Sequence, residues 1–204
     1  MPFTKLSLRE KKHATQKLNI LDMFAEKIKE KSLAETSVKE VAKELDISEM
    51  TFFNYFGSKK EVLIYFIELW SLEMQLLIEG SEPLDAIYLI FEQSAKTIEK
   101  NPNLFMEIVA SMALYGMAKK DIKITQAERV IRFGVDTVYS EGGFQDLMMP
   151  LLRQFKLSKE RELFVYTALY NTYFATPLLL KCPEFTTLQQ SYVAQLDFIL
   201  KEIR

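Results

Sequence analysis

The stretch from Thr36 to Leu63 constrains the fold more than any other part of this 204-residue chain. Ser37 and Ser48 stand where a serine hydroxyl can cap a helix, and Gly57 stands where a short helix can end. The segment predicts two short helices joined by a tight turn at residues 46–48, followed by the start of a third helix. From residue 50 to residue 56 the second helix carries polar and aromatic groups on nearly every face, whereas a helix that only packs has a cleaner apolar stripe.

The composition predicts that the rest of the chain is also helical. Glycine and proline number only 6 each, against 15 phenylalanines and 9 tyrosines, and an apolar content of 49% with 26% charge is that of an ordinary globular protein. Ser-x-x-Glu patterns at Ser7, Ser37 and Ser58 each head an apolar-periodic segment, as a capping box does. About nine helices are expected, near residues 8–31, 38–45, 48–57, 58–79, 83–100, 103–118, 125–140, 158–177 and 187–203. Residues 144–157 are expected to form a loop with a short helical piece.

The charge is unevenly distributed along the chain. Residues 1–62 hold 12 Lys and Arg against 10 Asp and Glu, whereas residues 63–204 hold 14 against 18. A basic start suits contact with phosphate, although a solvated terminus has the same composition. The single cysteine, Cys182, excludes an intrachain disulfide, and the first residues lack the apolar segment of a signal peptide. We therefore expect a reduced, cytoplasmic protein with no membrane partner.

The residues of the 36–63 segment resemble the helix-turn-helix of the TetR family of transcriptional regulators. The residues that match the family's positions and spacing are Val41-Ala42, Ile47-Ser48, Thr51-Phe52, Tyr55-Phe56, Lys59 and Val62-Leu63. The resemblance covers about residues 8–65, and beyond them only length and helix count match. It implies an all-α fold with a helix-turn-helix DNA-binding domain at residues 1–57. A helical effector-binding and dimerisation domain would follow at residues 58–204.

Three residues depart from the family pattern. Asp46 stands where the family has a turn glycine, and aspartate tolerates a left-handed backbone better than most residues, so the turn can form. Ser32 replaces the glycine that usually ends the first helix, so the following loop is expected to differ. Phe53 replaces a tyrosine whose hydroxyl would contact DNA, although an aromatic edge can still meet a thymine methyl.

Candidate DNA contacts follow from the resemblance and from side-chain chemistry. Lys39 can donate to guanine, Asn54 can pair with adenine, and Glu49 can accept from cytosine or merely favour the helix N-terminus. Lys59 would bind phosphate beside free helix N–H groups, its alternative being an ordinary surface lysine. Tyr55 is either a phosphate contact or a partly buried tyrosine. The full predicted set is Ser37, Lys39, Ser48, Glu49, Met50, Thr51, Phe53, Asn54, Tyr55 and Lys59, where Ser37 and Thr51 can also act as caps; Phe52 and Phe56 are expected to be buried.

The family plan implies an effector pocket and a dimer interface in the second half. Aromatic and methionine residues at helical spacing are candidate pocket residues, with plain core packing as the alternative for each. They are Trp70, Phe91, Met106, Met112, Tyr115, Phe133, Tyr166, Tyr170 and Tyr173. Few charges fall among them, so an apolar or aromatic effector is expected. The helix near residues 158–181 is apolar almost all round, and we expect it to form a homodimer together with residues 187–203, because paired half-sites require a two-fold axis.

The function expected from these features is that of a homodimeric repressor released from its operator by a small effector. An activator, or a regulator controlled by a protein partner, remains an alternative, as does a helical interaction protein that never binds DNA. Catalysis has little support, since His13 is the only histidine and Cys182 has no histidine in view for a nucleophile pair. No metal-ligand spacing or phosphate loop is present, so no catalytic residue, metal or cofactor is expected.

Overall fold

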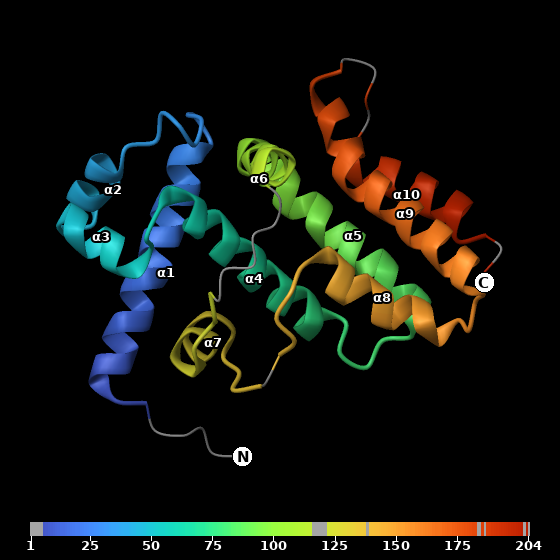
Figure 1. Ribbon diagram of the computed structural model, residues 1–204, viewed down its shortest axis with the longest axis horizontal. Helices are drawn as coiled ribbons and strands as arrows, with labels where there is room; N and C mark the ends of the chain where they lie inside the picture. Colours follow the sequence, from blue (N-terminus) through green and yellow to red (C-terminus); the bar gives the residue numbers. More distant parts are fainter. Residues whose placement is uncertain are drawn as a thin grey trace. The chain divides into compact units, whose positions relative to one another are not determined.

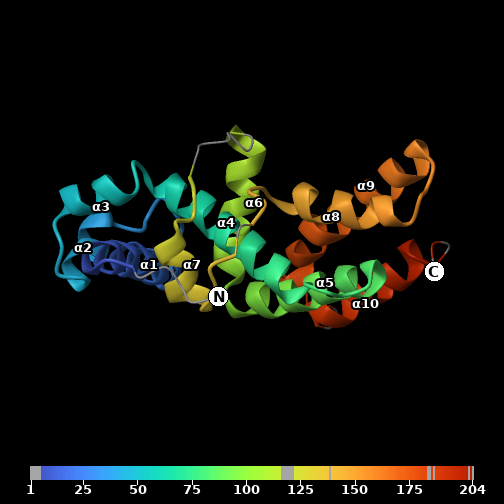
Figure 2. The same ribbon diagram turned by 90° about the horizontal axis from the view of Figure 1, so that it is seen from below.

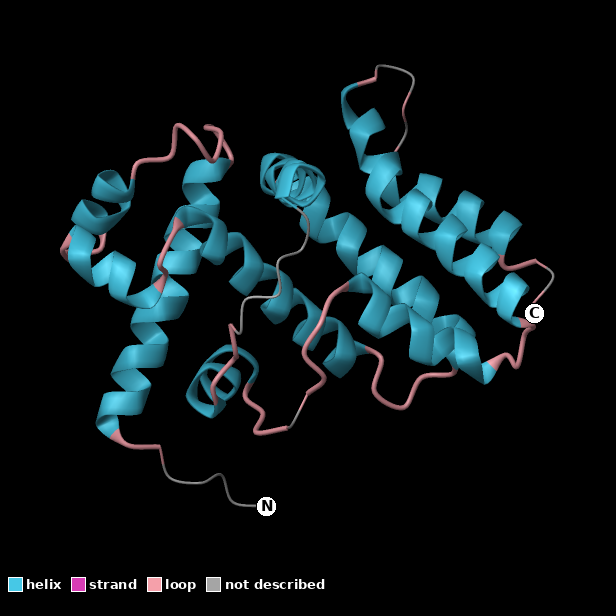
Figure 3. Cartoon of the chain, in the orientation of Figure 1, coloured by secondary structure: helices cyan, strands magenta, loops and turns pink. Residues whose placement is uncertain are grey.

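The computed structural model describes residues 6–115, 122–137, 139–182, 185, 187–201 and 203, apart from the side chain of Tyr115. Figure 3 shows only helices and loops in this part of the chain, and the predicted all-α fold is confirmed. The described residues form ten α-helices rather than about nine. They are α1 (Leu8–Ile28), α2 (Val38–Glu44), α3 (Glu49–Tyr55), α4 (Lys59–Leu77), α5 (Pro83–Lys100), α6 (Pro102–Tyr115), α7 (Gln126–Phe133), α8 (Phe144–Gln154), α9 (Lys159–Ala175) and α10 (Leu188–Ile199), with a 3₁₀ helix, η1 (Thr176–Lys181), after α9.

The chain divides into two compact units. The first comprises Met1–Trp70 and Glu107–Ser140, and the second comprises Ser71–Met106 and Glu141–Arg204. Helices α4 and α6 each begin in one unit and end in the other. The expected boundary between residues 57 and 58 stays a prediction. Among the described residues, no helix combines the length and the apolar composition that crossing a bilayer requires.

In the first unit, α1 is the helix on which the others pack. Ser7 caps it in a complete capping box with Glu10, as the sequence predicted, and its buried face includes Leu18, Phe24 and Ile28. Helices α2 and α7 pack against α1, and α3 follows α2 through a short turn (Figure 1). Asp46 in that turn has φ +52°, so the left-handed backbone expected in place of the family's glycine is confirmed.

A buried ion pair joins α1 to α7. Lys17 Nζ lies 3.1 Å from Glu128 Oε1, and the two side chains are 11% and 0% exposed. The other carboxylate oxygen, Oε2, accepts the Thr125 N–H at 2.9 Å and so completes the capping box of α7. Lys17 Nζ also lies 4.0 Å from the ring centroid of Tyr65 on α4, so three helices meet at this charge pair.

In the second unit, α5, α8, α9 and α10 form a helical bundle. Helix α10 packs against α5 and α9, and α8 packs against the same two helices, as Figures 1 and 2 show. Aromatic rings fill the interior: Phe91 and Tyr192 are buried with ring centroids 5.0 Å apart, and the Tyr192 hydroxyl donates to the Tyr173 carbonyl at 2.8 Å. The buried hydroxyl of Tyr192 therefore has a hydrogen-bond acceptor, a backbone carbonyl of α9.

Two expected helix boundaries were wrong. Helix α7 ends at Phe133, not near residue 140, because Gly134 takes the left-handed conformation that ends a helix, with φ +70°. Residues 144–154 form a regular helix, α8, although Pro150 lies inside it. Helix α9 ends at Ala175, close to the expected stop at Pro177, and the chain continues as η1.

Candidate functional site

Helix α3 presents one exposed face and one buried face. Phe52 and Phe56 are 0% and 1% exposed, and Phe52 packs against Phe24 of α1 with tilted rings whose centroids are 6.2 Å apart. The opposite face exposes Met50 and Phe53, whose exposed fractions are 74% and 48%. Glu49 and Asn54 are exposed on the same short helix. The burial predicted for Phe52 and Phe56 is confirmed. Because these two rings are buried, α3 exposes two large apolar side chains, Met50 and Phe53, and two polar ones, Glu49 and Asn54.

Two hydroxyl groups of the predicted set, those of Ser37 and Ser48, act as helix caps, whereas the cap expected for Thr51 was wrong because Ser48 is the N-cap of α3. Ser37 Oγ accepts the Glu40 N–H at 3.4 Å, at the start of α2, and Ser48 Oγ accepts the Thr51 N–H at 3.0 Å, at the start of α3. The Ser48 and Thr51 hydroxyls also lie 2.8 Å apart. Lys39, in contrast, is exposed on α2. The first turns of α2 and α3 therefore each combine a capping serine with an exposed side chain, Lys39 on α2 and Glu49 on α3.

Tyr55 is half-buried and lies against His13 of α1, with ring centroids 4.6 Å apart. Burial raises the pKa of Tyr55, so its phenol stays protonated and keeps its O–H donor. His13 itself is exposed. The sequence alone does not predict this contact between His13 and Tyr55, because no spacing rule connects residues so far apart on different helices.

Lys59, in the first turn of α4, is engaged by the protein itself. Its ammonium donates to three backbone carbonyls of the loop between α1 and α2, those of Leu33 at 2.6 Å, Ala34 at 2.9 Å and Thr36 at 3.1 Å. An ammonium group has three N–H donors, so these bonds use its full capacity. A phosphate contact by Lys59 would require at least one of them to break.

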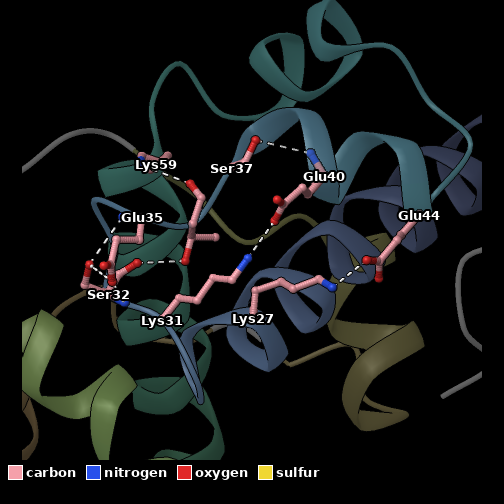
Figure 4. A network of polar contacts seen from close by, with 9 residues as sticks. Lys27, Lys31, Ser32, Glu35, Ser37, Glu40, Glu44 and Lys59 are labelled. Atoms are coloured by element: carbon pink, nitrogen blue, oxygen red, sulfur yellow. Dashed lines mark hydrogen bonds and ion pairs between the residues drawn. The ribbon is translucent and has the colours of Figure 1, made fainter.

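Polar contacts around this loop also tie α2 to α1, as Figure 4 shows. Lys31 lies 3.0 Å from Glu40, and Lys27 is paired with Glu44. Within the loop, the carboxylate of Glu35 accepts the backbone N–H of Ser32 at 3.0 Å and its hydroxyl at 2.8 Å, and these bonds hold the pKa of Glu35 below its ordinary value. Ser32, where the family pattern has glycine, thus caps a short turn.

The residues predicted to line an effector pocket do not all share one environment. Trp70, Phe91 and Tyr173 are almost fully buried, as core residues are, whereas Met106, Met112, Phe133, Tyr166 and Tyr170 are half-buried. The side chain of Tyr115 lies outside the described residues. Trp70, Met112 and Phe133 belong to the first unit, and Phe91, Met106, Tyr166, Tyr170 and Tyr173 belong to the second.

Four of these residues gather around Phe144, which the sequence reading did not select. The Phe144 ring centroid lies 4.5 Å from that of Tyr173, 6.0 Å from those of Phe91 and Tyr170, and 6.4 Å from that of Tyr166. Phe144 was missed because residues 144–157 were expected to be mostly loop. The pKa of Tyr166 is raised, first by burial and then by neighbouring Tyr170 and Asp146. This aromatic cluster has two half-buried tyrosines at its edge and is otherwise closely packed.

Large apolar side chains are exposed along α9, η1 and α10. Their exposed fractions reach 84% at Phe198, 63% at Leu163 and 61% at Phe164. Leu178, Leu179 and Val193 are also exposed in these elements. All six lie within the ranges from which a homodimer was predicted, and so many exposed apolar groups in adjoining elements are typical of an interaction surface.

Sequence comparison identifies one matching family. The profile of the bacterial regulatory proteins of the tetR family matches residues 20–66, which run from the middle of α1 into α4. This range contains the capped helices and the turn described above. Among curated protein sequences, no significant match was found.

Solved structures with the same fold cover nearly the whole chain. A TetR transcriptional regulator from Rhodococcus sp. RHA1 is 17% identical, with a TM-score of 0.57 over 95% of this chain and 98% of that one. Thermus thermophilus FadR, a TetR family repressor in complex with lauroyl-CoA, is 19% identical, with a TM-score of 0.59 over 90% and 93%. Bacillus subtilis FadR in complex with stearoyl-CoA is 15% identical, with a TM-score of 0.57 over 92% and 99%. At these identities the likeness concerns the fold.

Proposed function

Because this chain belongs to the TetR family of bacterial regulatory proteins, we propose that it is a homodimeric repressor that binds an operator in double-stranded DNA. A small apolar or aromatic effector would release it. The protein would act in the cytoplasm, where the operator is accessible. No catalytic step is part of this function.

The proposal of DNA binding rests on the exposed face of α3. A seven-residue helix that buries Phe52 completely while exposing Met50 and Phe53 leaves apolar surface that no other described residue covers. The major groove offers thymine methyl groups for such side chains, and it offers donors and acceptors for Glu49 and Asn54. A second helix held in this way behind a short turn is the arrangement by which helix-turn-helix proteins read base edges.

We assign the polar residues of α2 and α3 to the DNA backbone and the bases. Lys39 on α2 and Tyr55 at the end of α3 would contact phosphate or base edges. Ser37 and Ser48 hold the two helices by capping, and the Thr51 hydroxyl bonds to that of Ser48. A capping hydroxyl can also donate to a phosphate oxygen, because it uses only its acceptor in the cap.

Dimerisation would use the exposed apolar surface of α9, η1 and α10. Phe164 and Phe198 are the most exposed aromatic side chains on it, at 61% and 84%. A two-fold dimer presents two recognition helices, which then meet half-sites about one helical turn, or a multiple of it, apart on the same side of the DNA.

The effector would act by shifting the equilibrium between a DNA-competent and a DNA-incompetent conformation of the protein. A ligand lowers operator affinity only if it binds the DNA-incompetent conformation more tightly than the competent one. The half-buried Tyr166 and Tyr170, beside the buried Phe144, are the best-placed residues for contact with an apolar ligand. Because two fold neighbours hold lauroyl-CoA and stearoyl-CoA, long-chain acyl-CoA thioesters belong in the first panel of candidate effectors.

The test is a selection of bound fragments from genomic DNA, followed by affinity measurements on the selected site. Asn54→Ala should weaken binding to that site by about 1–3 kcal/mol and relax the preference at one base pair in each half-site. Lys100→Ala, at the exposed end of α5, is the matched surface control and should leave affinity and preference unchanged. Recovery of no common sequence, or an Asn54→Ala variant with wild-type preference, would contradict the proposal.

A further inference from the structure

The loop between α1 and α2, residues 29–37, is held from two other helices of the first unit. Lys59 of α4 donates to its carbonyls, as described above, and Glu107 of α6 accepts the backbone N–H of Leu33 at 2.9 Å. Leu33 therefore has its carbonyl bonded to α4 and its N–H bonded to α6. The loop ends at Ser37, the N-cap of α2, so these two bonds act on the backbone that starts the helix-turn-helix.

The electrostatics favour a structural partner for Lys59. A cation in the first turn of a helix faces the positive end of the helix dipole, so its ammonium requires acceptors to offset that repulsion. The carbonyls of Leu33, Ala34 and Thr36 supply them, and Thr36 is itself 1% exposed. By comparison, the ion pairs that join Lys27 of α1 and Lys31 of the loop to α2 lie at the surface, where such pairs contribute little.

The contact between Glu107 and Leu33 has a regulatory consequence because of where Glu107 lies on α6. Its first residues, up to Met106, belong to the second unit, and Glu107 is its first residue in the first unit. The same helix that leaves the effector-binding half thus bonds directly to the loop before α2. A change in α6 would act on the start of α2 through one backbone hydrogen bond.

We propose that Lys59 and Glu107 are positioning residues, which set the start of the helix-turn-helix from α4 and α6 and do not touch DNA. The proposal rests on the DNA-binding function proposed above for its effect on affinity. It replaces the phosphate contact expected for Lys59 from the family resemblance. The contact between Glu107 and Leu33 is then a point at which the effector-binding half can control operator affinity.

The first measurement is amide hydrogen exchange of the full-length protein without DNA. Lys59→Met keeps the aliphatic stem but removes all three donors, so exchange of the amides in residues 33–37 should accelerate. Glu107→Ala should accelerate the Leu33 amide, and Glu107→Gln, which keeps an acceptor oxygen, should restore its protection. Lys60→Ala, at the exposed neighbour of Lys59, is the control for lost charge and should leave this loop unchanged.

The second measurement separates positioning from phosphate contact. Operator affinity is titrated against salt for the same variants, because a lost phosphate contact lowers the slope of log K against log salt by about one. We expect Lys59→Met and Glu107→Ala to weaken binding about ten-fold with the slope unchanged. If Lys59→Met unfolds, Lys59→Arg and Glu107→Ala still test the proposal.

Two results would overturn the inference. One is a slope lowered by about one in Lys59→Met together with unchanged exchange in residues 33–37, which would make Lys59 a phosphate contact. The other is a Glu107→Ala variant with wild-type exchange at Leu33. Failure of the wild-type protein to bind any operator would contradict the proposed function, but the exchange results would still decide whether the loop is held in this way.

Discussion

Replacing Lys17 by methionine should destabilise the first unit far more than a surface charge would. The substitution keeps the apolar stem but leaves Glu128 as a fully buried carboxylate whose remaining hydrogen bond comes from the Thr125 N–H. Removing one member of a buried ion pair typically costs about 3–5 kcal/mol, because the other charge stays buried without compensation. We expect a loss in that range for Lys17→Met.

The magnitude follows from the geometry of the pair. At 3.1 Å and an effective dielectric constant of about 20, the attraction between Lys17 and Glu128 is roughly 5 kcal/mol. The desolvation of two ions opposes it by several kcal/mol each, so the pair as a whole contributes little net stability. The double variant Lys17→Met/Glu128→Gln should therefore be more stable than Lys17→Met alone, within about 1–2 kcal/mol of wild type. The amide oxygen that this variant introduces in place of the carboxylate would still accept the Thr125 N–H.

The assay is urea denaturation at fixed protein concentration, followed by the fluorescence of Trp70, the only tryptophan. Trp70 lies in α4 within the first unit, so its signal reports on the unit that contains the pair. A loss of about 3 kcal/mol corresponds to a melting temperature lower by about 6–12 °C, at roughly 2–4 °C per kcal/mol for a chain of this length. Asp22→Asn is the matched control, because Asp22 pairs with Arg132 between the same two helices at the surface and should cost less than about 1 kcal/mol.

Two outcomes would refute this reasoning. Lys17→Met could cost less than about 1 kcal/mol, which would mean that Glu128 reaches solvent or that the charges are not desolvated. Alternatively, the double variant could lose the sum of the two single losses. The two residues would then act independently and not as a coupled pair.

Three further predictions concern single residues. Tyr65→Phe should change stability by less than about 1 kcal/mol in the same denaturation assay, because the buried Tyr65 hydroxyl makes no hydrogen bond of ordinary geometry among the described residues and its nearby acceptor, the carboxylate of Glu128, gives only a weak contact; a loss above about 2 kcal/mol would show that this contact is a full hydrogen bond. Ser32→Ala keeps the backbone N–H bond, the larger cause of the lowered Glu35 pKa, but removes the hydroxyl bond, so this pKa should move only part of the way toward its ordinary value, as measured by carboxyl NMR titration. Because the wild-type pKa is lowered, the stabilisation is present at neutral pH and disappears as the pH falls through the folded-state pKa. Phe198→Glu should shift the protein toward monomer in sedimentation velocity, whereas Leu77→Glu, at an exposed apolar residue of α4, should not.

Local capping chemistry is the part of the fold that the sequence predicted best. Ser7, Ser37 and Ser48 cap the helices that they were expected to begin, and Asp46 takes the left-handed turn. These features depend on neighbours within four residues, so a single sequence contains them. A further Ser-x-x-Glu pattern at Ser32 was overlooked, although it signals the capped turn on which the loop before α2 is built.

Helix ends inside the second half were harder to predict because two signals competed. Gly134 ends α7, although the prediction carried this helix to residue 140, just before the glycine pair at residues 142–143. Residues 144–157 were expected to be mostly loop, yet the buried apolar face of α8, which includes Leu147 and Leu151, outweighs the one hydrogen bond that Pro150 removes. Tertiary packing decided the case of α8, and no local pattern contains it.

The contacts that give the site its mechanism lie beyond sequence patterns. Lys59 bonds to carbonyls more than 20 residues earlier, and Lys17 pairs with a residue more than 100 positions later. A lysine at the family's phosphate position was therefore assigned to DNA by resemblance. The structure places its ammonium on the loop before α2.

The central claim is sequence-specific DNA binding through α3, and a fluorescence-anisotropy titration tests it most directly. The labelled DNA is the region upstream of the protein's own reading frame, with scrambled competitor, at two salt concentrations. The account predicts tight binding that resists the competitor, weakens steeply as salt rises and falls about 5- to 150-fold in Asn54→Ala. Weak binding that is indifferent both to sequence and to Asn54→Ala, on this DNA and on fragments selected from the genome, would contradict it.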